Sequence, residues 1–214
     1  MSKNSKTNRR TQWISFGLNP IILTLSILIL ITTLNVTLTD YFIFQRSAIF
    51  DGEWWRVITG QVTHFTFAHT LYNLVGLWTA HWLFHEQLNG RKLNILWGIL
   101  LLSVGLSLLM FSDWEFYAGL SGALHGYWIF GLLTTRTPTA NWFLAAAGLL
   151  ILKVIMEIFA LFPQDDIEHL MQAAVAVEAH STGLLVGLAL ALADQYRLIQ
   201  QAWKEGVKVS IKNK

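Results

Sequence analysis

The chain has 214 residues, of which 54% are hydrophobic and 13% are charged. Soluble domains carry about 25% charged residues, so the composition excludes a soluble globular domain and indicates a helical membrane protein with several spans. The formal net charge of +2 says little about partners, and we expect none among nucleic acids. Because the chain has no cysteine, a thiol nucleophile, a thiolate metal site and disulfide bonds are excluded.

Six segments are apolar and long enough to be membrane helices, which need about 20 residues. The first, Leu18–Leu38, follows a basic tail and has Pro20 at its start, where proline is tolerated. Because no small-residue cleavage site follows, we interpret it as a membrane helix and not as a removed signal. The other five are His64–Phe84, Leu93–Phe111, Leu120–Thr134, Trp142–Phe162 and Met171–Ala193. The sequence therefore predicts an all-α membrane protein, with six transmembrane helices in a single domain over residues 1–214.

The placement of Lys and Arg predicts the orientation of these helices, since cytoplasmic loops carry most of the positive charge. Basic residues gather in the two tails and in the loops that follow the second and fourth segments. The opposite loops hold only Arg46 and Arg56. We therefore expect both termini to be cytoplasmic. The aromatic-rich loop 39–63 is expected outside, in the membrane interface.

Polar side chains inside a membrane are costly, and by default they suggest function. Here they gather toward the external halves of three segments. They are His64, His69 and Asn73 in the second segment, Ser121 and His125 in the fourth, and His180 in the sixth. This grouping predicts one polar site between these three helices.

The depth of the site follows from the helical rise of 1.5 Å per residue. His180 should lie roughly 13 Å below the start of its segment at Met171. The fourth segment is too short for a core of about 30 Å, so Ser121 should start at a similar depth. The loop 113–118 must then dip into the protein, which non-helical backbone tolerates only against protein or a wet cavity. A serine and a histidine in such a cavity are what hydrolysis within a membrane requires.

Four short motifs follow one another along the chain. They are Trp55-Arg56, His64-x4-His69-x3-Asn73, Gly119-Leu120-Ser121-Gly122 and Ala179-His180-x2-Gly183. Together, within a six-helix topology, they resemble the rhomboid family of intramembrane serine proteases over roughly residues 18–195. The resemblance implies a rhomboid-like bundle with its core at 18–195. It also implies a lipid-embedded protease that needs no cofactor or metal and cleaves transmembrane proteins.

One position departs from the wider family, in which a tyrosine stacks on the catalytic histidine four residues after the serine. Here that position is His125, and Glu178 precedes the Ala179-His180 pair. Both features resemble the rhombosortase branch. That resemblance implies a bacterial inner-membrane enzyme whose site opens toward the periplasm. It also implies substrates with a C-terminal GlyGly-CTERM tail, made of a small-residue motif, a hydrophobic helix and a basic cluster.

The proposed chemistry is nucleophilic attack by Ser121, with His180 as general base and then as acid for the leaving amine. Glycines on both sides of the serine permit close approach of a substrate. Glu178 is two residues from the base and on another face, so no acid is expected to orient the ring. The sequence therefore predicts a dyad and not a triad. Gly183 and Gly187 should let the sixth helix approach the fourth closely.

Other polar residues should support the dyad. His69 and Asn73 lie one turn apart on one face, which suits an oxyanion hole together with the backbone N–H of Ser121. His125 lies one turn after the serine and should stack on, or hydrogen-bond to, the His180 ring. Gly119 belongs to the serine motif, and His64 should shape the loop beside the site. Trp55 and Arg56 should anchor the first loop, with Gly126 and Gly131 serving helix packing.

Two further pairs have more than one interpretation. Lys153 and Glu157 lie one turn apart in the fifth segment and form either an intrahelical ion pair or part of a substrate gate. His81 and His85 have the spacing of a metal pair, but the following Glu86 is misplaced for H-E-x-x-H. We therefore expect no metal there.

Three structural interpretations compete with the protease. Ser121 could be a small residue at a helix contact, and the histidines could be polar links between helices. An inactive rhomboid-like protein that binds membrane clients usually lacks the serine or the histidine, and both are present here. A transporter with a histidine-lined path would carry polar residues through the whole membrane thickness, whereas most here stop at mid-depth.

Overall fold

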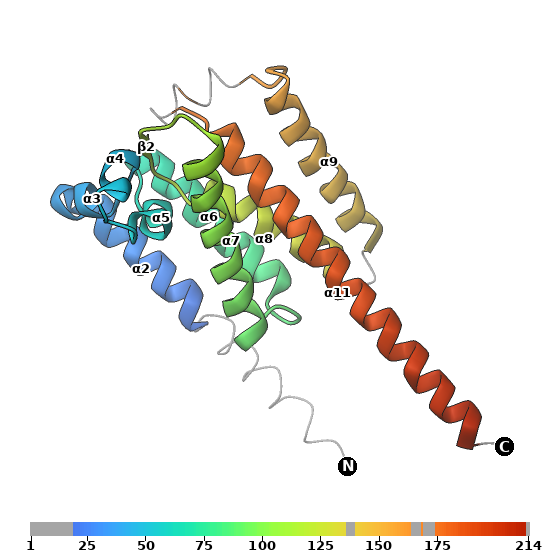
Figure 1. The fold of residues 1–214 in the computed structure, drawn as a ribbon. Helices are drawn as coiled ribbons and strands as arrows, with labels where there is room; N and C mark the ends of the chain where they lie inside the picture. Colours follow the sequence, from blue (N-terminus) through green and yellow to red (C-terminus); the bar gives the residue numbers. More distant parts are fainter. Residues whose placement is uncertain (1–18, 136–139, 164–167, 169–173, 213–214) are drawn as a thin grey trace, which may run out of the picture.

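The computed structural model describes residues 19–135, 140–163, 168 and 174–212. Over these residues the chain is mostly helical, with one short pair of strands (Figure 1). The elements are α2 (Pro20–Leu34), α3 (Val36–Phe42), β1 (Phe44–Gln45), α4 (Arg46–Phe50), α5 (Arg56–Thr59), the 3₁₀ turn η1 (Gly60–Val62), α6 (Phe67–Phe84), α7 (Gly90–Phe111), β2 (Phe116–Tyr117), α8 (Ser121–Thr134), α9 (Ala140–Ile158) and α11 (Val177–Lys212).

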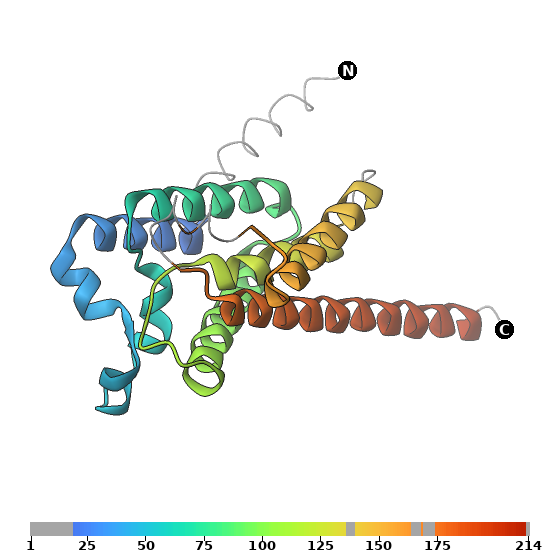
Figure 2. The same cartoon turned by 90° about the horizontal axis from the view of Figure 1, so that it is seen from above.

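Helix α8 lies at the centre of the bundle. It packs against α6, α7, α9 and α11, and most of its residues are buried. Helix α2 packs on the outer side against α6, and α11 continues well past the other helices at its C-terminal end (Figure 2). A residue on α8 is therefore surrounded by four helices, which makes this helix the natural position for a buried site.

The prediction of one continuous first helix, Leu18–Leu38, is wrong. Helix α2 ends at Leu34, and the chain turns by 117° into α3. The side chain of Asn35 accepts a hydrogen bond from the backbone N–H of Leu38, so Asn35 caps a new helix instead of continuing the old one. The predicted residue Leu18 lies outside the described residues.

The last two predicted helices also differ from the structure. Helix α9 ends at Ile158, short of the predicted Phe162, and Ala160 has a left-handed φ of 51°. Helix α11 begins at Val177 and runs to Lys212, whereas the predicted start at Met171 lies outside the described residues. The polar residues beyond Ala193 continue the helix because helix formation does not require hydrophobicity. His180 therefore lies in the first turn of α11, and residues 174–176 before it are not helical. A helical rise from Met171 does not give the depth of His180, which stays a prediction.

The second, third and fourth predicted helices agree with α6, α7 and α8 to within three residues at each end. Within the part of the chain that the structure describes, three helices are long and apolar enough to cross a bilayer: α7, residues 141–158 of α9, and residues 177–201 of α11. A fourth span results if α2 and α3 count as one bent crossing. Helix α8 is only about 21 Å long, which is shorter than a bilayer core. Six crossings and the positions of the termini therefore remain predictions.

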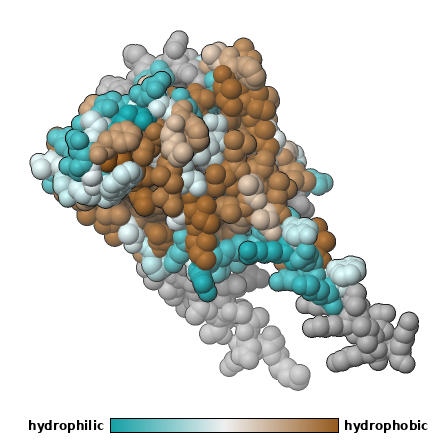
Figure 3. Space-filling model, viewed as in Figure 1, coloured by the Kyte–Doolittle hydropathy of each residue, from teal (hydrophilic) through white to brown (hydrophobic). Residues whose placement is uncertain are grey.

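The surface agrees with a membrane environment. The face in Figure 3 is hydrophobic across the middle of the bundle, with hydrophilic residues gathered around α3–α5 and toward the lower ends of α7 and α11. Large apolar side chains such as Leu102, Leu149 and Leu185 are exposed at the surface of the bundle. Exposed apolar side chains on this scale are expected where lipid and not water is the solvent.

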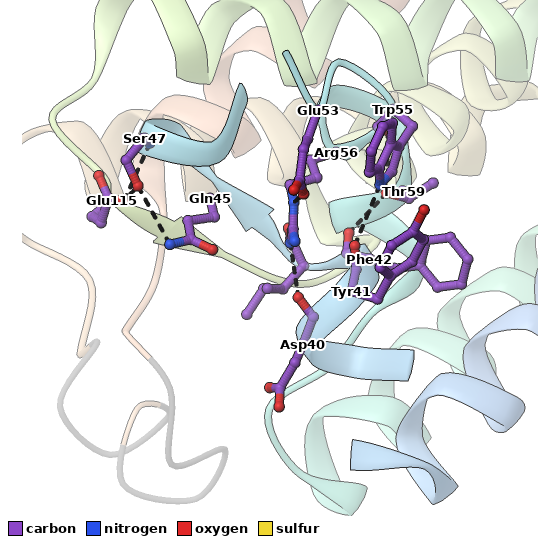
Figure 4. Close-up of polar contacts among 11 residues, drawn as sticks. Asp40, Tyr41, Phe42, Gln45, Ser47, Glu53, Trp55, Arg56, Thr59 and Glu115 are labelled. Carbon is purple, nitrogen blue, oxygen red and sulfur yellow. Dashed lines mark hydrogen bonds and ion pairs between the residues drawn. The ribbon is translucent and has the colours of Figure 1, made fainter. Parts of the chain in front are cut away.

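The first loop is held by Arg56, as the sequence predicts. Its guanidinium is buried and donates to the backbone carbonyls of Asp40 and Ile43, both at 2.8 Å, and pairs with Glu53 (Figure 4). The indole of Trp55 stacks on Tyr41, with ring centroids 5.4 Å apart. These contacts close the loop on itself.

A second arginine connects the first loop to the bundle. Arg46 donates from its guanidinium to the carbonyls of Leu108 and Leu109 in the last turn of α7, and to those of Ser112 and Trp114 just after it. Carbonyls at the end of a helix lack an intrahelical partner, so a side-chain donor there stabilises the helix end. Beside it, β1 pairs antiparallel with β2, and Phe44 lies opposite Tyr117. This strand pair, which the sequence did not predict, carries the segment that leads into α8.

Glycines allow α8 and α11 to touch at their backbones, which confirms the predicted close approach. A Cβ on Gly183 would collide with the carbonyl oxygen of Gly122, and one on Gly187 would collide with that of Gly126. Any larger residue at these positions must push the two helices apart.

We therefore predict that Gly183→Ala lowers the free energy of unfolding by about 1–3 kcal/mol, the usual cost of overpacking. The matched control is Gly148→Ala on α9, where an added methyl meets no atom within 4 Å in the described part of the chain. Thermal unfolding in detergent measures both. Equal midpoints for the two variants would contradict the close-contact account.

Candidate active site

Ser121 and His180 meet where α8 and α11 begin. Ser121 is the first residue of α8, and His180 lies in the first turn of α11. The Oγ of Ser121 is 2.9 Å from Nε2 of His180, although the residues are 59 positions apart in sequence. A serine hydroxyl within hydrogen-bond distance of an imidazole is the geometry that removal of its proton requires.

His125 stacks on the His180 ring, which confirms the contact expected from its position. The two ring centroids are 4.1 Å apart and the planes are inclined by 24°. Nδ1 of His125 lies 2.7 Å from the backbone oxygen of Ser121, so this nitrogen donates and carries the ring proton. His125 therefore supports the His180 ring from the side of α8.

An acid does lie beside the His180 ring, so the prediction of a site without one is wrong. Oε2 of Glu157, on α9, is 3.0 Å from Nδ1 of His180, and the Glu157 side chain is 2% exposed. Glu178, the acid closest to His180 in sequence, instead accepts a hydrogen bond from the indole N–H of Trp114 at 3.2 Å. Sequence distance was misleading here because the acid comes from another helix.

Lys153 completes the cluster. Its Nζ lies 2.5 Å from Oε1 of Glu157, 2.9 Å from Nε2 of His125 and 3.4 Å from Nδ1 of His180. Lys153 and Glu157 therefore form an intrahelical ion pair, which is one of the two predicted interpretations, and the pair also contacts both imidazoles. The other interpretation, a substrate gate, stays a prediction. Because charged side chains inside a membrane helix are costly, the presence of Lys153 and Glu157 in an apolar segment was the signal that could have assigned both to the site.

The same residues have some features of a metal site. One ligand atom each from His125, Glu157 and His180 lies within 4.8 Å of the others. However, the ammonium of Lys153 contacts all three and already supplies a positive charge there. A cation would have to displace this ammonium.

Helix α6 brings two further predicted residues to the site. The side chain of Thr66 caps the helix through the N–H of His69, and the amide of Asn73 donates to the His69 carbonyl at 3.0 Å. Gly119 has a φ of 132°, and a Cβ there would lie 2.7 Å from Cε1 of His69. Only glycine fits both the backbone and the ring beside it. His64 lies outside this helix, with its ring edge-on to His69 at 4.8 Å.

A comparison with known protein families matches residues 51–197 to the Rhomboid domain. This range covers more than half of the chain and includes every residue of the cluster. The chain belongs to the rhomboid family. It is therefore a multi-pass membrane protein from a family of intramembrane serine proteases that cleave transmembrane substrates.

In this rhomboid, Ser121 and His180 face a cavity of about 580 Å³ between α6, α8 and α9. His69, Asn73, His125, Lys153 and Glu157 also line it. The rest of the wall is mainly apolar, with Leu124, Trp128, Leu132, Leu149 and Leu150 among its residues. The cavity thus combines a polar end with an apolar wall suited to a hydrophobic peptide. Gly119 and His64 are not among the lining residues of the cavity, and His81 and His85 lie at the far end of α6.

Proposed function

We propose that this rhomboid is an active intramembrane serine endopeptidase, with Ser121 as nucleophile and His180 as general base. The observation that carries the proposal is the 2.9 Å contact between Oγ of Ser121 and Nε2 of His180, on the wall of a cavity of about 580 Å³. An inactive relative has no need for this contact.

The reaction begins when Nε2 of His180 accepts the hydroxyl proton while Oγ of Ser121 bonds to the carbonyl carbon of the scissile peptide. As the tetrahedral intermediate collapses, the C–N bond breaks and His180 gives the proton to the leaving amine. Water then attacks the acyl carbon while His180 takes a proton from it. As the ester C–O bond breaks and the acid product leaves, His180 gives this proton to Oγ of Ser121.

The negative charge of the tetrahedral intermediate needs donors. Ser121 is the first residue of α8, so its backbone N–H has no intrahelical partner. The amide of Asn73 and the ring of His69 line the same cavity. We assign these three groups to the oxyanion hole, where one donor is worth about 10²–10³-fold in kcat.

A finer proposal concerns the substrate and the membrane. We propose that the enzyme is a rhombosortase of a bacterial inner membrane, with six crossings, both termini cytoplasmic and the site open to the periplasm. Its substrates would be exported proteins with a GlyGly-CTERM tail. The supporting features are His125 in place of the family tyrosine, stacked on His180, and Glu178 before the base. The substrate class rests on the resemblance of these motifs.

We predict that Ser121→Ala and His180→Ala each abolish cleavage of a transmembrane client. Each removes a group that the chemistry needs, and neither opens a large cavity, so membrane insertion and thermal unfolding should stay near wild type. Client cleavage is followed by mobility shift. The control is Ser181→Ala, whose hydroxyl bonds only to the backbone of its own helix in the described structure. Cleavage by Ser121→Ala would end the serine-protease proposal.

His125→Tyr should keep substantial activity, because an aromatic ring again supports His180. His125→Ala should lose more, because the base is then free to tilt. Initial cleavage rates of the three proteins at equal concentration test this order. If His125→Tyr is as inactive as Ser121→Ala while His180→Ala remains active, the base has been assigned wrongly.

The substrate class is tested with two reporters that share one transmembrane helix and one basic C-terminal cluster. One carries GlyGly before the helix, and the other carries ValVal there. We expect the first to be cleaved at least tenfold faster, since each excluded methyl group is worth roughly 10-fold or more in discrimination. Equal rates would leave the protease in place and remove the tail specificity.

A further inference from the structure

We infer that Glu157 is a positioning residue, which holds His180 in the tautomer able to accept the proton of Ser121. The site is then a serine–histidine–glutamate triad assembled from three helices. This inference rests on the proposed serine-protease function and adds to it the group that fixes the tautomer and orientation of His180. The carboxylate reaches no substrate atom itself and acts only through the imidazole.

The tautomer argument starts from the proton count of a neutral imidazole, which has one N–H and one acceptor nitrogen. Nε2 of His180 must be the acceptor, because it faces the hydroxyl of Ser121 at 2.9 Å. The proton must therefore sit on Nδ1 and needs an acceptor of its own. Oε2 of Glu157 lies 3.0 Å from Nδ1, and an ionised carboxylate can only accept. This contact fixes both the tautomer and the plane of the ring.

Lys153 makes the carboxylate necessary. Its ammonium lies 3.4 Å from Nδ1 of His180 and can only donate. Without Glu157, this ammonium would favour Nδ1 as acceptor and move the ring proton to Nε2, which is the unproductive tautomer. It would also oppose the positive charge that His180 gains when it takes the serine proton. The carboxylate of Glu157, 2.5 Å from the ammonium of Lys153, offsets the positive charge of that ammonium.

Lys153 in turn holds the stacked ring. Its ammonium donates to Nε2 of His125 at 2.9 Å, while Nδ1–H of the same ring donates to the backbone oxygen of Ser121. The two members of the ion pair of α9 thus have different roles. The carboxylate of Glu157 fixes the tautomer of His180, and the ammonium of Lys153 fixes the His125 ring that stacks on it. This division explains why both charges are present in a membrane helix, where a plain intrahelical pair would bring little.

The inward face of α9 is the only part of that helix with charged side chains among its described residues. Glu157 is 4% exposed, whereas Leu149, Leu152 and Ile155 on the same helix are between 43% and 68% exposed. The ion pair therefore points into the bundle while the outer face meets lipid. Because Glu157 lies on α9, the packing of α9 against α8 and α11 decides whether its carboxylate reaches Nδ1 of His180.

The test uses the purified full-length protein in detergent and a transmembrane reporter that the wild type cleaves. Glu157→Gln keeps the shape of the side chain but replaces an oxygen acceptor with an amide. We expect kcat to fall by on the order of 10²–10⁴-fold, with KM changed less than threefold, because only the state of the base is altered. Glu157→Asp, which keeps the charge, should recover at least tenfold over the Gln variant. Glu178→Gln is the matched control and should stay within threefold of wild type.

A double-mutant cycle tests the role of Lys153 and remains decisive if Glu157→Gln does not fold. Lys153→Met/Glu157→Gln has no unpaired charge, and its kcat is compared with that of Lys153→Met. We expect the added Gln to lower kcat at least tenfold even in this background. We also expect the double variant to exceed Glu157→Gln when the latter folds. An unchanged kcat on adding Gln overturns the inference.

Two further outcomes are distinguishable. If Ser121→Ala is inactive while Glu157→Gln has the wild-type kcat, the positioning role falls and the serine protease stands. If Ser121→Ala remains active, the proposed function falls first and the inference with it. A metal held by His125, Glu157 and His180 would instead make kcat sensitive to EDTA and recoverable with Zn²⁺, which would also overturn the ion-pair account.

Discussion

Ser121 and His180 lie on different helices, so their contact depends on how closely the backbones of α8 and α11 approach. The glycines at 122, 126, 183 and 187 provide that approach, because a Cβ on either α11 glycine would meet a carbonyl oxygen of α8. Both residues also lie at the start of their helices, where the two chains enter the bundle side by side. A shift of α11 by the width of one methyl group would lengthen the 2.9 Å contact beyond hydrogen-bond distance.

The second dependence is on charge. A carboxylate and an ammonium within a membrane bundle are tolerated only when each is paired and fully hydrogen-bonded. Glu157 and Lys153 satisfy each other and then the two imidazoles, so the cost of burying them is offset by contacts that the site needs. Helices α8, α9 and α11 each contribute one member of the proposed triad, while α6 contributes the far wall of the cavity. The site is therefore a property of the assembled bundle and of no single segment.

Local sequence signals predicted much of this arrangement. Hydrophobic length located α6, α7 and α8 well, and polar residues within apolar segments identified Ser121, His125 and His180. Hydrophobic length failed where another interaction decides the helix end, as at Asn35, whose side chain caps α3. It failed again at the C-terminal end of α11, where a polar helix simply continues. The strand pair between β1 and β2 had no periodic signal, since each strand has two residues.

The acid beside His180 was missed for a different reason. Glu178 is the acid close to His180 in sequence, whereas Glu157 is 23 positions away on another helix. The ion pair of α9 was visible in the sequence, but its direction relative to α8 and α11 follows from tertiary packing. The predicted depth of His180 assumed a helix that starts at Met171, whereas the helix that carries His180 begins at Val177. Placing ionisable residues of all membrane helices in one candidate site would have found Glu157.

The most direct measurement is to identify the residue that a fluorophosphonate probe modifies in the intact protein in membranes. Such a probe bonds to a serine whose proton an adjacent base removes. Peptide mass spectrometry of the labelled chain should give a single adduct, on Ser121, which disappears in His180→Ala. An adduct on another serine, or no adduct on a folded protein that still cleaves its client, would contradict the account.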